Sequence, residues 1–239
     1  MERHENYFVW LFNQLKGWPV QNYCLWFFAF GFQLALLIQA KVTSVTLITF
    51  IGTLLGTLCV LAINGWLGLI SAACFIYAGW SAKNYLSIFE QIAYIATLDL
   101  PVILSVRSWN DDTKNHLRKF GGREWVIAIV GTLAVYLVSG FLIGKFTNDP
   151  RPWVDAISFA ISLTAGIMCF MRYNNQYFWW TASGIFQLIL WGITYAQGDA
   201  NLAMAINSLI YVINDVLAFT VSPWFNMGRR KSGLKEISK

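Results

Sequence analysis

The sequence predicts an all-α polytopic membrane protein in which two parallel three-helix repeats are joined by a linker helix, with one additional N-terminal helix. Three observations predict this fold. Hydrophobic residues make up 57% of the chain and charged residues only 12%, against roughly 25% charged residues in an average soluble domain. The apolar residues fall into eight long runs, and two groups of three runs match each other in length and spacing.

The eight apolar runs are each long enough to cross a bilayer, which takes about 20 mostly apolar residues. Several links between them are very short, such as Asn64 and Gly65. Short links require neighbouring helices to pack as antiparallel hairpins. We therefore expect eight membrane-spanning helices, at residues 22–40, 45–63, 66–82, 87–106, 125–144, 154–171, 177–196 and 202–222.

Residues 1–44 precede the repeats and contain two different segments. The first twenty residues, MERHENYFVWLFNQLKGWPV, lack the basic start and apolar centre of a cleavable signal peptide. They are polar and aromatic, and Trp10 and Trp18 are suited to anchoring at headgroup depth. We expect an amphipathic helix on the membrane surface, followed by the additional spanning helix.

The basic residues indicate how the chain is oriented. With eight spans, both termini and the long link 107–124 lie on one side of the membrane. Thirteen of the seventeen Lys and Arg residues fall on that side, and Lys41, Lys83, Lys145 and Arg151 fall on the other. The positive-inside rule places the more basic side, with the C-terminus, in the cytoplasm. If the first helix lies on the surface instead, only the N-terminus changes sides.

Two polar regions lie outside the repeats. Residues 107–153 combine the cytoplasmic link with the linker helix, and residues 225–239 form a basic tail. A basic segment beside a span attracts anionic lipids and fixes topology, so we favour this role over nucleic-acid binding.

Residues 45–106 and residues 154–224 form an internal repeat. One helix separates the two units, so both enter the membrane from the same side. Parallel repeats of this kind are found in transporters, with the substrate near the midplane where the repeats meet. The matched pairs are Trp66 with Trp179, Gly79 with Gly192, Gln91 with Asn207, and Asp99 with Asp215.

Polar and aromatic side chains recur on single helix faces inside the spans, because residues three, four or seven apart share a face. Amides supply donors and acceptors, and aromatic rings stack on flat solutes or attract cations. These side chains could also serve only as contacts between helices. We predict a site for a flat, hydroxylated, uncharged or weakly cationic solute such as a nucleoside or vitamin. Its residues are Asn207, Tyr211 and Asn214 in the last span, Trp180, Gln187 and Trp191 in the span before it, and Gln91 and Tyr94 in the first repeat.

Glu90, Asp99 and Asp215 are the acids deepest within the predicted spans. Intramembrane acids are usually functional, so they could couple transport to protons or balance a cation. They could equally accept hydrogen bonds that hold helices together. Asp99 and Asp215 occupy equivalent repeat positions, which favours the structural role.

The chain lacks the residue sets of intramembrane enzymes and metal sites. Both histidines, His4 and His116, lie in polar segments, and the four cysteines show no CxxC spacing. Gly121 and Gly122 are not followed by the Lys and Ser or Thr of a phosphate-binding loop. We therefore expect no enzymatic activity, no metal and no cofactor. A sensor or scaffold subunit is an alternative from another class.

The stretch YFWWTASGIFQLILWGITYAQGDANLAMAINSLIYVINDVLAF, residues 177–219, together with the arrangement of three helices, a linker helix and three more, resembles the PnuC family of bacterial vitamin B3 transporters. More loosely, it is similar to the SWEET sugar carriers. The resemblance covers residues 45 to about 224. It implies a protein of the bacterial inner membrane that imports nicotinamide riboside by facilitated diffusion, and it allows a homo-oligomer.

The resemblance also implies a mechanism and leaves alternatives. A cytoplasmic kinase that phosphorylates the imported nucleoside would sustain inward flow without an ion gradient. Relatives that carry thiamine or deoxynucleosides, and proton-coupled import, are alternatives. Alternating access would rock one three-helix unit against the other. The glycines expected to permit the necessary close approach of backbones are Gly52, Gly56, Gly79 and Gly192.

Overall fold

The computed structural model describes residues 9, 13, 15–62, 64–105, 118–200 and 202–221. Most of the expected surface helix at the N-terminus, most of the long link and the basic tail lie outside these residues.

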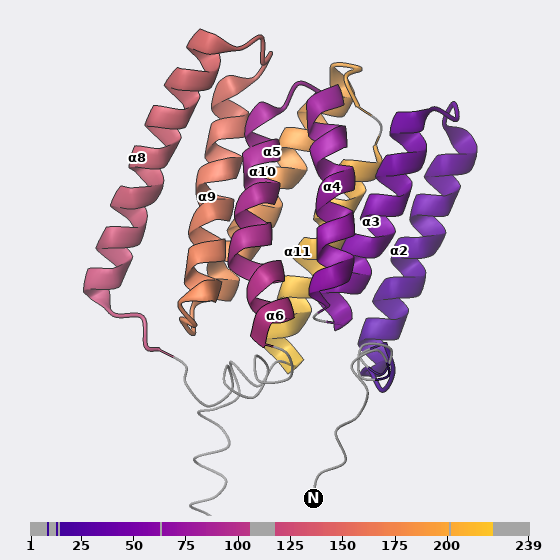
Figure 1. The fold of residues 1–239 in the computed structure, drawn as a ribbon, viewed down its shortest axis with the longest axis horizontal. Helices are drawn as coiled ribbons and strands as arrows, with labels where there is room; N and C mark the ends of the chain where they lie inside the picture. The colour runs from indigo at the N-terminus through magenta and orange to yellow at the C-terminus, as the bar shows by residue number, and fades with distance from the viewer. Residues whose placement is uncertain are drawn as a thin grey trace, which may run out of the picture.

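Eight apolar helices follow one another in antiparallel order through the described part of the chain (Figure 1). The fourth of them is continuous through three labelled segments, α5, η1 and α6. The helices are α2 (Val20–Gln39), α3 (Ser44–Ala62), α4 (Gly65–Ser81), α5 (Tyr85–Tyr94) with η1 (Ile95–Asp99) and α6 (Leu100–Ser105), α8 (Gly122–Phe146), α9 (Pro152–Phe170), α10 (Gln176–Ala196) and α11 (Ala203–Val221).

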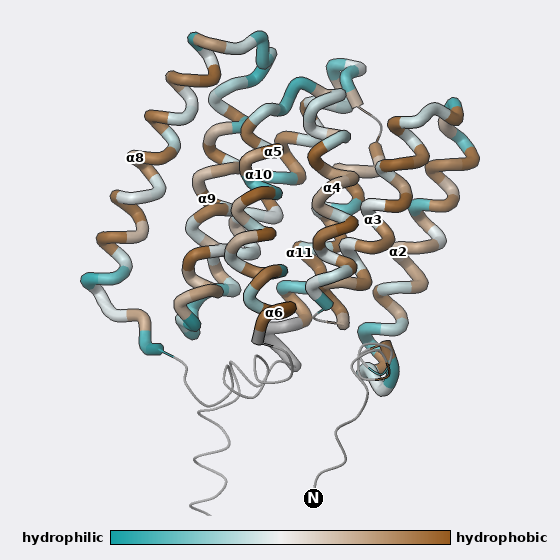
Figure 2. Tube along the Cα trace, in the orientation of Figure 1, coloured by the Kyte–Doolittle hydropathy of each residue, from teal (hydrophilic) through white to brown (hydrophobic). Residues whose placement is uncertain are grey.

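The surface of this bundle is suited to lipid. Val126, Val130 and Phe141 on α8 are each more than half exposed, and apolar residues follow the helices while polar residues gather at both ends (Figure 2). Five of the described helices are long and apolar enough to cross a membrane: α2, α3, the segment Tyr85–Leu104, α8 and α9. The helix α4 and the stretch Ala203–Leu217 of α11 are apolar but shorter.

The two predicted three-helix units are present as α3–α4–α5 and α9–α10–α11, with α8 as the linker. In each unit the middle helix packs against both neighbours. The units meet through α5 against α9 and through α11 against α3. The last helix of each unit thus packs on the first helix of the other, as two parallel copies related by a pseudo-twofold axis would do. The additional helix α2 packs against α3 and α11.

The π-helix η1 interrupts the α-helical register of the fourth span. Leu100 donates its backbone N–H to the carbonyl of Ile95, five residues earlier. Pro101 follows directly, and a proline cannot donate this bond and clashes with the carbonyl four residues before it. A π-segment accommodates that proline, and such segments often lie at functional sites. The even α-helical spacing that we used for this span ends at Tyr94.

Three links at the upper end of the bundle in Figure 1 are tied together by Arg151, whose residue is 5% exposed. Its Nε donates to Asn84 Oδ1 at 2.8 Å, and its Nη2 donates to the carbonyl of Ala82. Its Nη1 donates to Asp199 Oδ2 at 2.8 Å and also to Gln197. The arginine therefore joins the α4–α5 link of the first unit to the α10–α11 link of the second.

The glycines make close contacts at three of the four expected positions. A Cβ on Gly52 would lie 2.6 Å from Cys74 Cβ, and one on Gly79 would lie 3.2 Å from the Asn84 carbonyl; Gly56 is described with the site below. The expectation for Gly192 is wrong, because a Cβ there would meet no atom of the described residues within 4 Å. Gly68, which the sequence did not single out, lies directly against the carboxylate of Asp99.

The linker helix is held to the second unit by a hydroxyl pair. Thr132 Oγ1 on α8 lies 2.7 Å from Thr164 Oγ1 on α9, and both residues are buried. Interhelical hydrogen bonds of this kind in membranes contribute about 0.6 kcal/mol on average. We expect a double-mutant cycle of Thr132→Val and Thr164→Val to give a coupling energy of about that size in the free energy of unfolding. Additive single effects would mean that the two hydroxyls act separately.

Candidate functional site

Glu90 lies at the centre of a polar cluster between the two units. It is only 2% exposed, although α5 is otherwise largely apolar. Tyr94, one turn further along the same helix, donates its hydroxyl to Glu90 Oε1 at 2.6 Å. Gln187 on α10 donates from Nε2 to Glu90 Oε2. The two donors come from different units, so this carboxylate joins the units inside the membrane.

Gln187 is held at both ends of its amide. While its Nε2 faces Glu90, its Oε1 accepts a 2.9 Å bond from the indole nitrogen of Trp191. A carboxylate only accepts and an indole N–H only donates, so these partners determine which way the amide points. Trp191 is buried against Phe75 of α4 and Met204 of α11. We call Glu90, Tyr94, Trp180, Gln187 and Trp191 the Glu90 cluster.

Trp180 completes this cluster on its other side. Its ring lies 5.5 Å from that of Tyr94, centroid to centroid, with a tilt of 53°. One helix turn separates it from Ser183, whose hydroxyl lies 2.6 Å from that of Ser162 on α9. The cluster therefore combines three aromatic rings, one amide and one carboxylate, contributed by α5 and α10.

Asn207 and Tyr211 lie on the face of α11 that meets the first unit. A Cβ on Gly56 of α3 would collide with the Tyr211 hydroxyl and lie 2.7 Å from Ser71 Oγ on α4. Asn207 is 3% exposed, and its Oδ1 has no hydrogen-bond partner among the described residues. A buried carbonyl oxygen without a donor is uncommon in native structures and requires an explanation.

We expect Gly56→Ala to reduce uptake by about 5- to 150-fold. The new methyl group must displace Tyr211 or Ser71, and overpacking of a tight core costs about 1–3 kcal/mol. Uptake into cells of labelled nicotinamide riboside, the substrate that the resemblance implies, checks this. Gly131→Ala on α8 is the control, because no atom of the described residues lies within 4 Å of a Cβ at that position. Equal uptake by both variants would show that this contact is not important for transport.

Asp99 ends the π-segment and is buried against α3 and α4. Cys59 Sγ donates to its Oδ1 at 3.9 Å, and Gly68 leaves room for the carboxylate. Asp99 therefore lies on the same side of the bundle as Tyr211 rather than in the Glu90 cluster.

The structure groups some of the predicted residues and leaves others apart. Tyr94, Trp180, Gln187 and Trp191 form the Glu90 cluster, whereas Asn207 and Tyr211 lie together at α3 and α4. The half-buried Gln91, Asn214 and Asp215 take no part in the hydrogen bonds of either group that the structure describes. Glu90 itself was noted only as a deep acid. Its spacing of four residues from Tyr94 was the available signal.

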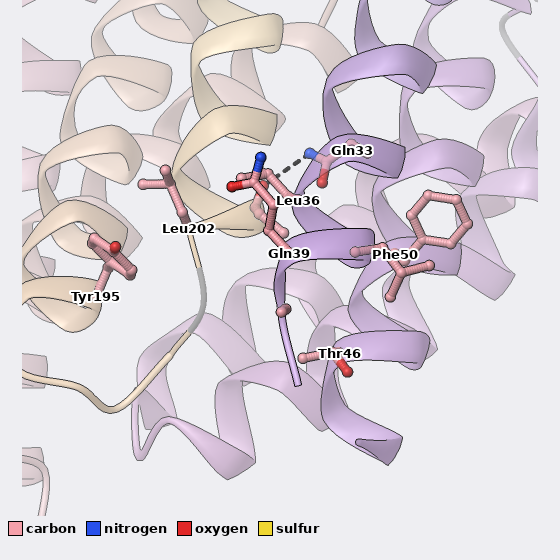
Figure 3. A pocket seen from close by; sticks show the side chains of 10 residues that line it. Gln33, Leu36, Gln39, Thr46, Phe50, Tyr195 and Leu202 are labelled. Atoms are coloured by element: carbon pink, nitrogen blue, oxygen red, sulfur yellow. Dashed lines mark hydrogen bonds between the residues drawn. The ribbon is translucent and has the colours of Figure 1, made fainter. Parts of the chain in front are cut away.

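A cavity of about 290 Å³ lies at the upper end, where α2 meets the core (Figure 3). Gln33 on α2 reaches across and donates to the carbonyl of Ala203 at 3.0 Å. Leu36, Phe50 and Leu202 contribute apolar walls. None of the eight predicted substrate-binding residues lines this cavity. It is therefore separate from the Glu90 cluster.

Comparison with known proteins identifies the family. Residues 46–226 match the family described as nicotinamide mononucleotide transporter. The nicotinamide riboside transporter PnuC of Neisseria mucosa is 21% identical over 205 residues, which cover 81% of this chain and 73% of that protein. A crystal structure of the vitamin B3 transporter PnuC has the same fold, with a TM-score of 0.73 and 17% identity, covering 93% of this chain and 98% of the other.

These comparisons confirm the predicted resemblance and the predicted class of fold. The family match extends over both three-helix units and the linker helix, and it leaves out α2. The chain belongs to the nicotinamide mononucleotide transporter family.

Proposed function

We propose that this protein carries nicotinamide riboside across the bacterial inner membrane. The observation that carries the proposal is the Glu90 cluster, in which aromatic rings and a fixed amide from both units meet inside the spans. Family membership and the name of the Neisseria mucosa relative support the same substrate.

The charges around the two groups of residues favour a riboside over the mononucleotide in the family's description. A mononucleotide carries a phosphate, which proteins bind with Arg, Lys or backbone N–H groups. Among the described residues, the carboxylates beside the two groups are those of Glu90, Asp99 and Asp215. The buried guanidinium of Arg151 is already bound to Asp199, Asn84 and Gln197. A phosphate would meet repulsion, whereas a riboside without phosphate would not.

Four of the predicted contacts have a matching feature of the substrate. Trp180, Trp191 and Tyr94 would stack on the nicotinamide ring. The unpartnered Asn207 Oδ1 would accept a hydrogen bond from the carboxamide or a ribose hydroxyl. The proposed set of contacts remains Gln91, Tyr94, Trp180, Gln187, Trp191, Asn207, Tyr211 and Asn214.

Transport would proceed by alternating access, with the two units rocking about the site as in SWEET-like carriers. The bonds of Arg151 support this proposal, because they close the bundle at its upper end by joining the two units there. Facilitated diffusion would need no ion gradient, and phosphorylation by a cytoplasmic kinase would retain the vitamin. The C-terminus would lie in the cytoplasm.

Binding and uptake by the purified protein test the proposal. Titration with nicotinamide riboside, nicotinamide, thiamine and thymidine should show binding of the riboside before the others. In proteoliposomes, we expect the riboside to equilibrate at the same rate with and without a pH gradient. If a pH gradient drives accumulation of the riboside, proton coupling replaces facilitated diffusion as the mechanism. If the protein prefers thiamine or thymidine, that molecule replaces nicotinamide riboside as the proposed substrate.

A further inference from the structure

Glu90 is a buried ionisable acid without a cationic partner among the described residues. It is 2% exposed. Both of its hydrogen-bond donors, the Tyr94 hydroxyl and the Gln187 amide, are neutral. The hydroxyl of Ser162 lies beside it and is neutral as well. The ion pair that the described residues form, between Arg151 and Asp199, lies at the upper end of the bundle.

Holding α5 to α10 does not by itself require a charge. A glutamine in place of Glu90 would keep the acceptor for Tyr94 on the same helix, would give up only the acceptor that faces Gln187 on α10, and would avoid burying a charge. An unpaired buried charge carries a penalty of several kcal/mol, and intramembrane acids are rare unless they have a function. The charge itself therefore requires an explanation that hydrogen bonding alone does not provide.

The surroundings of the carboxylate indicate what kind of cation it balances. Tyr94 joins the carboxylate to the ring of Trp180, and Gln187 joins it to Trp191. Aromatic faces attract organic cations, particularly in desolvated sites. The described residues contain no group of three His, Cys, Asp or Glu side chains that could hold a metal ion. One carboxylate flanked by rings is instead suited to a flat aromatic cation.

We infer that Glu90 is the counter-charge for a permanently cationic aromatic ring and determines that the protein selects cations over neutral molecules of the same shape. This inference rests on the proposed function and deepens it. Nicotinamide joined to ribose through its ring nitrogen is such a cation, whereas its reduced dihydro form is uncharged. Tyr94 and Gln187 position the carboxylate, and the flanking rings stack on the ligand.

The experiment compares binding of the oxidised and reduced ribosides by purified protein. The wild type should bind the cation at least about tenfold tighter than the dihydro form. Glu90→Gln should weaken binding of the cation on the order of 30-fold, as expected for removing one partner of a buried charge pair. Binding of the neutral form should change less than about threefold.

Asp155→Asn is the matched control. Asp155 is also a fully buried carboxylate with two donors, the backbone N–H of Leu86 at 2.7 Å and the Ser87 hydroxyl at 3.0 Å, but it lies at the upper end of α9. This variant should lower the melting temperature and leave the ratio of the two affinities unchanged. If Glu90→Gln does not fold, the inference is tested by the wild-type protein alone, through the ratio of its affinities for the oxidised and reduced ribosides. Equal binding of the two ribosides by the wild type overturns the inference.

Thiamine, also a cation, separates failure of the inference from failure of the proposed function. Binding of thiamine but not the riboside, with the same dependence on Glu90, overturns the proposed substrate and supports the counter-charge. If the protein binds the riboside but Glu90→Gln leaves the ratio of affinities for the oxidised and reduced forms unchanged, the counter-charge is overturned and the proposed function is supported. Binding of neither cation overturns both.

Discussion

Gln187→Leu is expected to reduce uptake of nicotinamide riboside about 100-fold. The leucine fills a similar volume but removes the donor to Glu90 and the acceptor for Trp191. Each buried group left without a partner costs about 1–3 kcal/mol, and 1.4 kcal/mol corresponds to a tenfold change. Gln187 connects the Glu90 carboxylate to the Trp191 indole. Its replacement therefore disturbs the proposed substrate contacts on both sides of the amide.

The same helix provides the control for this variant. Among the described residues, the Thr181 hydroxyl bonds only to the carbonyl of Tyr177 within α10, so Thr181→Val should keep uptake near the wild-type level. Initial rates should be normalised to the amount of folded protein in the membrane. Retention of more than about a third of the wild-type rate by Gln187→Leu would contradict the proposed site.

Arg151→Leu is expected to destabilise the protein by about 2–6 kcal/mol, because two buried polar groups lose their donor and each such loss costs about 1–3 kcal/mol. The substitution leaves the Ala82 carbonyl, the Asn84 amide and the Asp199 carboxylate without the donor that joined them. Thermal or denaturant unfolding in detergent measures the change. The effect should be large because three links lose their common contact at once.

Two variants test this interpretation of Arg151. The side chain of Asp199 is 38% exposed, and a partly exposed ion pair contributes at most about 1 kcal/mol. Asp199→Asn should therefore be much milder than Arg151→Leu. Arg151→Lys keeps the charge but loses the planar fork of donors, and its stability should fall between the two. A loss below about 1 kcal/mol for Arg151→Leu would show that the links hold together without it.

The helices could be predicted closely from the sequence. The runs at 45–63, 66–82 and 177–196 correspond to Ser44–Ala62, Gly65–Ser81 and Gln176–Ala196. A spanning helix forms all of its backbone hydrogen bonds within one continuous segment. Its position can therefore be predicted from the local run of apolar residues. The π-segment was missed, although Pro101 was the local signal for it.

The candidate site could be predicted only in part. Helical spacing correctly placed Gln187 and Trp191 on one face, and they bond to each other. The same spacing could not show that Glu90 on α5 faces Gln187 on α10. The two residues are 97 positions apart in the chain, and spacing within one helix says nothing about a second helix. Arg151 was counted only as an outer basic residue for the same reason.

The sequence alone determined the class of protein, the helices, the repeat and the types of side chain available for a ligand, because each follows from composition or from spacing within one helix. The tertiary structure decided which of those side chains meet. It placed Glu90 rather than Gln91 at the centre of the cluster. It also packed Tyr211 against Gly56 and brought three interhelical links into contact with Arg151. Such contacts depend on how helices distant in sequence pack against one another, and packing is a property of their combined surfaces.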